Sequence, residues 1–482
     1  MIKKIHSKYK KLSLQVQASI WYTICNVLNK GIALLSTPFF TRLMTAAEYG
    51  KFAIFQSWYS ILIIFTSLNI FLGSYQKGMI LYKNKKDKFT SSQLGLTTTL
   101  TFIFFIIYIL GINFWTEIFE LSPFLMVFMF LELFSMPAFE FWAVRNRFEY
   151  KFKRYVIVTF ISSLLSIVCG VLAVWMSSNK VEARVVTDVI SKMIFSLPLF
   201  IIIFYRGKSF YNRKYWKYAL SFSLPLIPHY LANYILGQSD RLMIGKIIGS
   251  KEAAFYSVAY TISMMMMLIV SAINNSFIPY LYKCLDEKRL KDIKVVTKPI
   301  IILVSALSLI TIIFAPEIIL IFAGRNFIDA IYVIPPIAIS VFFIFIYSLY
   351  SNIEYFYQKT GFISIATLLS GVINLILNYI FINIYGYYAA GYTTLLCYIL
   401  LSIFHYYFYR KIIDRRVEKG FELYDSKFII LISFLLVGIM LIMLFIYKYI
   451  VIRYVFLMIL FIISIKNKEI FINSLKKIKG RR

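Results

Sequence analysis

Charged residues are scarce in this sequence, and acidic residues especially so. Only 15% of the 482 residues are charged, and 22 Asp and Glu stand against 52 Lys and Arg. A typical water-soluble protein is about a quarter charged, whereas 60% of this chain is hydrophobic and its mean hydropathy is +0.76. The shortage of charge excludes an ordinary soluble enzyme, a disordered protein and a secreted disulfide scaffold. No polar, basic domain carries the net charge of +30, so nucleic-acid binding is excluded as well.

Cysteine and histidine are also few. The four cysteines form no CxxC pair and fall in or beside apolar runs, which is typical of small buried side chains. The three histidines belong to no HExxH motif, and neither a P-loop nor a GxGxxG motif is present. We therefore expect no catalytic residues, no metal site, no cofactor and no ATP-driven transport by this chain alone.

What the sequence has in abundance is long apolar runs. A membrane-spanning helix needs about 20 mostly apolar residues, and the sequence predicts an all-α polytopic membrane protein with about fourteen such helices. The predicted spans are 15–39, 52–72, 94–114, 124–142, 155–175, 185–205, 218–236, 253–278, 299–322, 332–353, 362–382, 388–408, 428–447 and 449–465.

The basic residues test this topology. With the N-terminus placed inside and fourteen alternating spans, 40 Lys and Arg fall in inside segments and 10 in outside segments. The positive-inside rule asks for such a bias, so we expect both termini to be cytoplasmic. The basic start of the chain is then the beginning of the first helix rather than a cleaved signal. The surplus charge is explained by orientation and by contact with anionic membrane lipids.

Weak internal repeats suggest how the spans are grouped. The sequence Arg-Leu-Met follows the first and seventh predicted helices, at 42–44 and 241–243, and Leu-Leu-Ser occurs in the fifth and eleventh. The order and similar spacing of these matches predict two six-helix lobes of like topology, residues 1–210 and 211–410. Residues 411–482 would add two helices and a basic cytoplasmic tail. The longest loop expected outside the membrane is 237–252. Because it is short, we expect no separate domain outside the membrane.

Short motifs in both halves resemble a known family. Residues 47–53 read Ala-Glu-Tyr-Gly-Lys-Phe-Ala, 240–245 read Asp-Arg-Leu-Met-Ile-Gly, and 255–260 read Phe-Tyr-Ser-Val-Ala-Tyr. Together with Asn374 and residues 378–386, they resemble bacterial oligosaccharide flippases, including O-antigen flippases. This family is part of the superfamily that also contains the MATE drug exporters.

The resemblance implies a function. It points to translocation of undecaprenyl-diphosphate-linked oligosaccharides, for O-antigen or for capsule or exopolysaccharide, across the bacterial cytoplasmic membrane by alternating access between two lobes. The implied partners are that lipid-linked glycan, membrane lipids, and a polysaccharide polymerase with its chain-length regulator. The expected coupling ion is a proton or a sodium ion.

Polar residues inside the apolar helices are the candidate site, because burying each ionisable group costs about 2.5–3.5 kcal/mol on insertion scales. Cations facing a central cavity would hold a diphosphate, and a buried carboxylate would handle the coupling ion. The substrate-binding candidates are Lys30, Lys192, Arg241, Asn26, Asn233, Asn374 and Asn378. The ion-coupling candidates are Asp188, Glu132 and Glu140.

Each candidate also has a purely structural explanation. Asp188 and Lys192 lie four residues apart and would neutralise one another on a helix. Glu140 and Glu354 would pair with Arg145 and Lys359, each five residues further on. The two asparagines of the eleventh predicted helix would hydrogen-bond neighbouring helices.

Three other functions remain open. A drug or cation exporter on the same fold would favour acidic and apolar cavity groups, against the lysines and arginine found here. A membrane glycan polymerase or ligase would present a large outside loop. A channel would carry a repeated pore loop.

Overall fold

The computed structural model describes residues 14–359, 361–417 and 420–466, and in these ranges every regular element is a helix. The predicted all-α class is therefore confirmed. The helices form two compact units, the first ending at Ala254 and the second beginning at Phe255. The predicted N-terminal start of the chain and its basic C-terminal tail fall largely outside the described residues.

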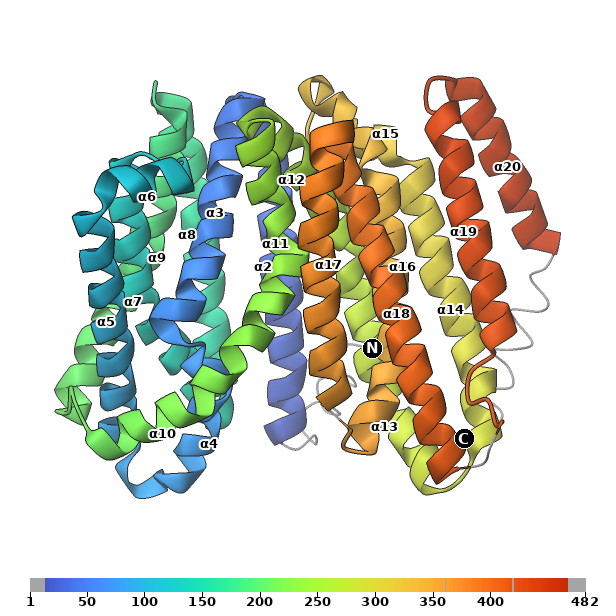
Figure 1. The fold of residues 1–482 in the computed structure, drawn as a ribbon. Helices are drawn as coiled ribbons and strands as arrows, with labels where there is room; N and C mark the ends of the chain where they lie inside the picture. Colours follow the sequence, from blue (N-terminus) through green and yellow to red (C-terminus); the bar gives the residue numbers. More distant parts are fainter. Residues whose placement is uncertain (1–13, 360, 418–419, 467–482) are drawn as a thin grey trace, which may run out of the picture. The chain divides into compact units, whose positions relative to one another are not determined.

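The described part of the first unit begins with six long helices, between which lie several short ones (Figure 1). The long helices are α2 (Leu14–Leu43), α3 (Ala46–Ser67), α5 (Lys86–Leu110), α7 (Pro123–Phe148), α8 (Phe152–Met176) and α9 (Lys180–Gly207). The short ones are α4 (Ser74–Leu81) and α6 (Ile112–Phe119), with 3₁₀ turns η1 (Ile70–Leu72) and η2 (Lys83–Lys85). Helix α9 packs against α5, α7 and α8, and this places it at the centre of the polar contacts described below.

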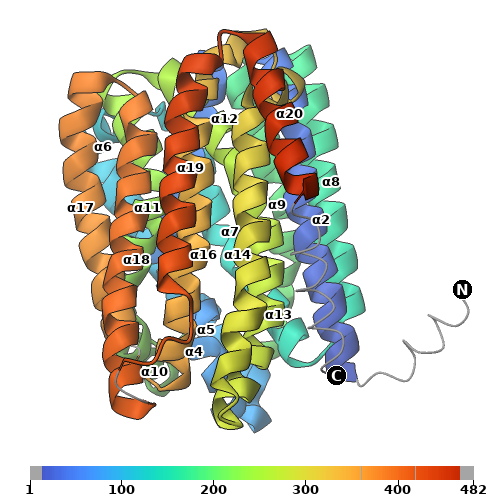
Figure 2. The same ribbon diagram turned by 90° about the vertical axis from the view of Figure 1, so that its right-hand side faces the viewer.

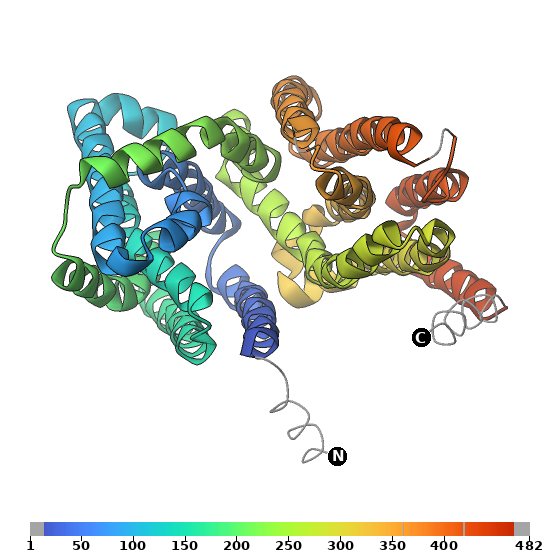
Figure 3. The same cartoon turned by 90° about the horizontal axis from the view of Figure 1, so that it is seen from below.

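The seventh predicted span is bent in the structure. Helix α10 (Arg213–Ser223) lies across one end of the first unit, and the 3₁₀ turn η3 (Leu224–Leu226) joins it to the upright α11 (Ile227–Ile247) (Figures 1 and 3). Pro225 lies in that turn and Pro228 in the first turn of α11. A proline lacks the backbone N–H that a continuous helix needs, which explains why the helix is interrupted at these prolines.

The predicted outside loop at 237–252 was wrong. Helix α11 continues to Ile247, and α12 (Ser250–Met264) begins three residues later. The polar run that suggested a loop instead packs on α3: Ser57 donates a hydrogen bond to Gln238, with 3.4 Å between the two oxygens.

Two local signals on α3 fix how it begins and what it packs against. A capping box begins the helix: Thr45 accepts a hydrogen bond from the backbone of Glu48, and the Glu48 carboxylate accepts one from the backbone of Thr45. Further on, Gly50 allows α3 to touch the start of α12. A Cβ atom at position 50 would lie 1.6 Å from the carbonyl oxygen of Ser250, so only glycine fits there.

The second unit is built from the rest of α12 and from eight further α-helices. These are α13 (Met266–Asp286), α14 (Leu290–Ile313), α15 (Ala315–Phe322), α16 (Ile334–Phe356), α17 (Gly361–Tyr385), α18 (Tyr388–Arg416), α19 (Ser426–Ile446) and α20 (Ile450–Lys466), with the 3₁₀ segment η4 (Arg325–Tyr332) before α16. Helices α14, α16, α18 and α19 run side by side (Figure 2). Helix α16 lies at the core of this unit, and most of its side chains are buried.

All fourteen predicted spans coincide with helices, although their ends differ by several residues. By length and composition, ten helices in the described part of the chain are apolar enough to cross a membrane, and α12 with α13 counts as one of them. The contacts group α10 and α11 with the first unit, since α11 packs on α3 and α10 on α5. The lobe boundary at 210/211 and the like topology of the lobes stay predictions.

Candidate functional site

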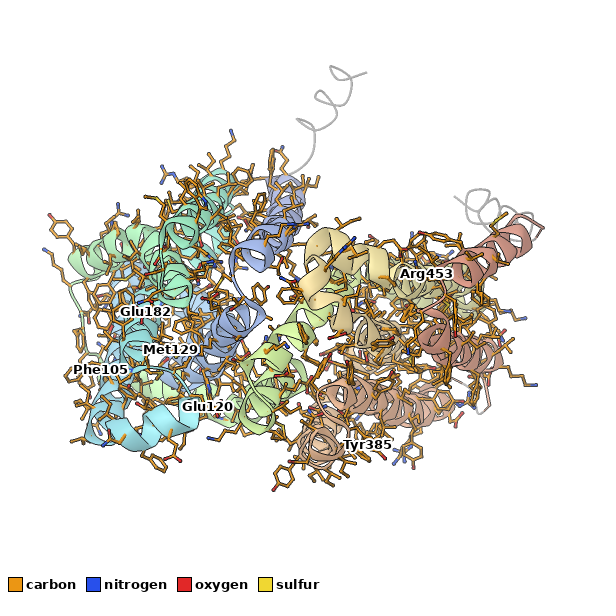
Figure 4. The ribbon with its side chains drawn as sticks, turned by 90° about the horizontal axis from the view of Figure 1, so that it is seen from above. Phe105, Glu120, Met129, Glu182, Tyr385 and Arg453 are labelled. Atoms are coloured by element: carbon orange, nitrogen blue, oxygen red, sulfur yellow. The ribbon has the colours of Figure 1, made fainter. Side chains whose placement is uncertain are left out.

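A buried ionic cluster joins α7 and α9 in the first unit. The Lys192 Nζ atom lies 2.6 Å from Glu132 Oε1 and 2.8 Å from Asp188 Oδ2. The two carboxylate residues are almost completely buried, at 1% exposed for Glu132 and 6% for Asp188. Met129, one turn before Glu132 on α7, lies inside the same unit (Figure 4). The cluster therefore stands within the helix bundle and not on its surface.

Two further helices hold the Asp188 carboxylate in place. Ser166 on α8 donates a hydrogen bond to Oδ1 at 2.6 Å, and Gln56 on α3 donates one to Oδ2 at 3.3 Å. With Lys192 also bound to it, Asp188 has partners on both oxygens. An acidic side chain with this many donors is stabilised in its charged form.

Arg184 is a member of this cluster that the sequence analysis missed. It lies one turn before Asp188 on α9, is 7% exposed, and places its guanidinium 3.9 Å from the ring centre of Phe40 and 4.7 Å from that of Phe52. We assigned it to an outside loop, because the predicted helix began at residue 185. The signal was available, since residues 184, 188 and 192 are spaced for one face of a helix.

The formal charges of the cluster balance, with two cations and two carboxylates. This balance explains how four ionisable groups are tolerated among apolar helices, where an uncompensated charge is costly. Among the described residues, Glu132 Oε2 is a buried oxygen without a hydrogen-bond partner. Glu132 is therefore the carboxylate of the cluster with room to accept a proton or to contact a small cation.

The neutralised pair that we considered for Asp188 and Lys192 is present, and Glu132 extends it. Lys192 is thus engaged by two carboxylates in this structure. The cavity interpretation assumes that the charge of Lys192 is available to an anionic substrate. In this structure the two carboxylates already compensate that charge. Binding of a substrate by Lys192 stays a prediction.

The other predicted residues of the first unit lie apart from this cluster in their contacts. Lys30 and Asn26 are exposed on α2. The next polar residue on that helix, Asn29, accepts a hydrogen bond from Ser163 on α8 at 3.1 Å. Lys30 is therefore a cation on a helix surface, and its role as a cavity residue stays a prediction.

On α11 each of the two predicted residues contacts a neighbour on the same helix. Asn233 is exposed, and its Nδ2 atom lies 3.2 Å from His229 Nε2. Arg241 is half-buried and donates a hydrogen bond to Gln238, which in turn contacts Ser57 on α3. The end of α11 is thus tied to α3 through polar side chains.

Glu140 does not pair with Arg145, so that structural alternative was wrong. Arg145 instead forms ion pairs with Asp87 at the start of α5 and with Glu149 just after α7. Glu140 is half-buried on α7. Its predicted part in ion coupling stays a prediction.

In the second unit, Asn374 and Asn378 link α17 to α18. Asn374 donates to Thr394 at 3.4 Å, Thr393 donates to Asn378, and the two asparagines bond to each other at 3.2 Å. Both side chains are fully buried. The structure thus contains the helix-to-helix bonds that we considered as the alternative to glycan contact.

A buried acid–histidine pair in the second unit was also missed. The Glu354 Oε1 atom on α16 lies 2.8 Å from His405 Nδ1 on α18, and both residues are 0% exposed. The expected partner of Glu354, Lys359, contacts only its backbone carbonyl among the hydrogen bonds of the described residues. The sequence offered little warning, because a lone histidine in an apolar helix matches no motif.

No metal centre was predicted, and the described residues contain no group of three His, Cys, Asp or Glu side chains placed to hold a metal ion.

Comparisons with known proteins place this arrangement in context. The sequence model of the family described as "Polysaccharide biosynthesis protein" matches residues 16–285, and the one described as "MatE" matches residues 225–380. A Haemophilus influenzae protein described as an uncharacterized membrane protein is 25% identical over 376 residues, covering 76% of this chain and 89% of that protein. Another, described as Lsg locus putative protein 1, is 24% identical over 369 residues, covering 74% and 88%.

Solved structures share the fold at low sequence identity. The lipid II flippase MurJ in its inward closed conformation has a TM-score of 0.68 and 15% identity, covering 94% of this chain and 99% of that chain. A multidrug resistance MATE family transporter in its inward-facing conformation has a TM-score of 0.61 and 13% identity, covering 80% and 94%. The predicted MATE-like fold is thereby confirmed, and these neighbours are a flippase and a transporter rather than enzymes.

The family match fits the residues from which the resemblance was drawn, since the motifs at 47–53, 240–245 and 255–260 all lie within it. It spans more than half of the 482 residues. This chain is a multi-pass membrane protein and belongs to the polysaccharide biosynthesis protein family.

Proposed function

We propose that this protein is a flippase for oligosaccharide repeat units linked to undecaprenyl diphosphate. It would move them from the inner to the outer leaflet of the bacterial cytoplasmic membrane. The family and the fold support movement of a lipid-linked substrate within a polysaccharide pathway. The glycan, whether O-antigen, capsule or exopolysaccharide, is the finer part of this proposal.

The observation that carries the proposal is the compensated ionic cluster of Glu132, Asp188, Lys192 and Arg184. Ionisable groups inside membrane helices are rare and typically mark ion or substrate pathways. A cluster that served packing alone would be replaceable by apolar side chains at little cost. Its presence within the first unit therefore supports a part in transport.

Glu132 is the proposed coupling residue. Its Oε1 atom faces Lys192, while its Oε2 atom is buried and carries no hydrogen bond within the described part of the chain. Taking up a proton there would release Lys192 from one of its two acidic partners. A sodium ion would instead add a charge beside Lys192. We therefore favour the proton over sodium, and Glu132 over Asp188, whose two oxygens already have donors.

A second candidate, an exporter of drugs or organic cations, gains from the same observation. The argument against it was the excess of cations among the candidate residues, and two carboxylates neutralise Lys192 in the structure. Lys30 and Arg241 are then the cations of the first unit that support an anionic substrate. The two functions differ in what the cell loses when the gene is deleted.

The orientation and the partners follow from the same proposal. Both termini would be cytoplasmic, as the basic residues predict. A polysaccharide polymerase and its chain-length regulator would act on the product at the outer leaflet.

The test is complementation of a deletion strain, with surface glycan as the readout. Loss of surface glycan with accumulation of the lipid-linked precursor inside supports the flippase. Unchanged glycan with increased sensitivity to cationic drugs would overturn it in favour of the exporter.

Single variants then examine the residues. Lys30→Ala should abolish surface glycan, Lys30→Arg should retain part of it, and Lys411→Ala at the exposed end of α18 is the matched control. Glu132→Gln should uncouple transport in membrane vesicles from the proton gradient. A Glu132→Gln variant that still responds fully to that gradient would exclude Glu132 as the coupling residue.

A further inference from the structure

A polar pocket lies at one end of the first unit, apart from the ionic cluster. It has a volume of about 110 Å³ and lies between the beginnings of α5 and α8 and the ends of α7 and α9. Its polar and charged lining consists of Asp87, Thr90, Arg145, Asn146, Glu149, Lys151, Arg154 and Arg206. None of the functions discussed so far uses it.

The charges of this pocket do not balance, in contrast to those of the cluster. Its two acids, Asp87 and Glu149, are both engaged: Arg145 pairs with each of them, and Lys151 pairs with Glu149. Burial raises the pKa of Glu149, but the hydrogen bonds from Lys151 and Arg145 outweigh it and hold that pKa below its usual range. Glu149 is therefore charged near neutral pH.

Two arginines are left over. Arg154 and Arg206 are exposed at the rim of the pocket, and the acids of the lining are already paired with other cations. They give the lining a formal surplus of two positive charges. Arginine binds phosphate oxygens through two parallel N–H groups, which makes a pair of arginines at a polar pocket suited to a phosphate group.

The surroundings of the pocket indicate which kind of molecule would carry this phosphate. On one side the lining is apolar, formed by Leu199, Ile202 and Ile203 of α9. The same helix exposes a run of large apolar side chains next to it: Ile194, Ile201, Ile202 and Tyr205. A phosphate at the rim would therefore have a hydrocarbon-binding helix face directly beside it. This is the geometry of an amphiphile at a membrane interface.

The charge pattern places this end of the bundle at the cytoplasmic surface. With the N-terminus inside, the segments that line the pocket are all cytoplasmic ones. The inner leaflet carries anionic lipids, and their negative surface potential attracts Lys and Arg.

We propose that this pocket binds the phosphate of an anionic phospholipid headgroup, with Arg154 and Arg206 as the phosphate ligands and the exposed face of α9 against an acyl chain. Binding of a phospholipid at this site requires no transported glycan, so this proposal can be tested independently of the flippase proposal. It would fasten the cytoplasmic ends of α7, α8 and α9 to the inner leaflet.

The experiment compares lipid binding by the full chain and by two charge-matched double variants. R154Q/R206Q removes the proposed ligands, and R415Q/R416Q removes two exposed arginines from the end of α18. Each purified protein is titrated in neutral detergent with phosphatidylglycerol, with phosphatidylcholine and with inorganic phosphate, and bound lipid is counted by native mass spectrometry.

We expect the chain and the R415Q/R416Q control to bind phosphatidylglycerol in preference to phosphatidylcholine. At about 1 kcal/mol for each arginine near an anionic surface, R154Q/R206Q should bind phosphatidylglycerol about 30-fold more weakly. Equal loss in both double variants would overturn the proposal, because it would show only a general effect of surface charge. Equally tight binding of inorganic phosphate would overturn the lipid as the source of the phosphate.

A protein-level control separates binding from folding. R154K/R206K keeps both charges and loses the paired N–H groups of the guanidinium. It should bind phosphatidylglycerol with an affinity between those of the chain and of R154Q/R206Q. If R154K/R206K binds no better than R154Q/R206Q while remaining folded, charge at the rim is not what holds the lipid.

Discussion

Removing Lys192 should destabilise the first unit strongly, because it takes away the cation that both buried carboxylates, Glu132 and Asp188, contact. The change is Lys192→Met, which keeps the length and much of the volume of the side chain. Breaking a buried ion pair by removing one partner costs about 3–5 kcal/mol. The lysine side chain is 25% exposed while that of Glu132 is 1% exposed, so we take the lower end of that range, about 3 kcal/mol.

The assay is the free energy of unfolding of the purified protein, measured by titration with a denaturing detergent in mixed micelles. A loss of about 3 kcal/mol is a change of more than a hundredfold in the folding equilibrium, well within the resolution of such a titration. Lys51→Met is the matched control, since Lys51 is an exposed lysine on α3. It should change the free energy of unfolding by less than about 0.5 kcal/mol.

Compensating changes distinguish charge from packing. Adding Glu132→Gln to Lys192→Met removes one stranded carboxylate and leaves Asp188 balanced by Arg184, and the double variant should recover most of the lost stability. If the double variant is as unstable as Lys192→Met alone, the cost lies in side-chain packing and the electrostatic reasoning is refuted. If Lys192→Met costs no more than the Lys51 control, the cluster is not a structural ion pair at all.

Three further predictions concern other contacts. Gly50→Ala should cost about 1–3 kcal/mol by overpacking α3 against α12, whereas Gly31→Ala, with nothing within 4 Å of the added Cβ, should be neutral in the same titration. A hydrogen bond from a lysine of α14 lowers the pKa of Asp425 at the start of α19. The stabilising effect of the charged Asp425 should therefore be present above about pH 4 and be lost as the pH falls through the lowered pKa. Asp425→Asn should abolish that part of the acid sensitivity, and unchanged acid sensitivity in this variant would contradict the prediction. His405→Phe should lower the free energy of unfolding by about 3 kcal/mol, because it leaves the buried Glu354 without its partner. Adding Glu354→Leu should restore part of that stability. No recovery in the double variant would contradict a stabilising role of the Glu354–His405 pair.

The positions of the helices could be predicted because lipid imposes a simple rule. A segment that crosses a bilayer must be long and apolar, and only a helix satisfies its backbone groups there. Each of the fourteen predicted spans falls on helical segments in the structure for that reason, although some of them are divided between two helices. The bend at Pro225 was predictable on equally local grounds, since proline removes a backbone donor.

Errors arose where polar residues lie inside helices. The segment Gln238 to Arg241 was assigned to a loop, because four consecutive polar residues do not resemble a span. In the structure their helix continues, and Gln238 finds a partner on α3. Arg184 was assigned to a loop for the same reason, although two aromatic rings cover its guanidinium. Hydropathy alone cannot distinguish a polar residue that has a buried partner from one that needs water.

The candidate site was predictable in part, for a related reason. Spacing along one helix revealed Asp188 and Lys192, because residues four apart share a face. The third member, Glu132, lies 60 residues away on α7, and no sequence spacing connects α7 to α9. The same limit applied to Glu354 and His405, which lie 51 residues apart.

The two units solve the problem of buried polar groups in different ways, and the difference bears on mechanism. In the first unit, Lys192 forms ion pairs with Glu132 and Asp188, and Arg184 acts on Asp188 as a second cation, so a change of one proton leaves an unbalanced charge among apolar helices. In the second, neutral amides and hydroxyls link α17 to α18, and such bonds do not depend on protonation near neutral pH. A coupling ion should therefore act on the first unit, where binding one proton at Glu132 shifts the balance of the whole cluster.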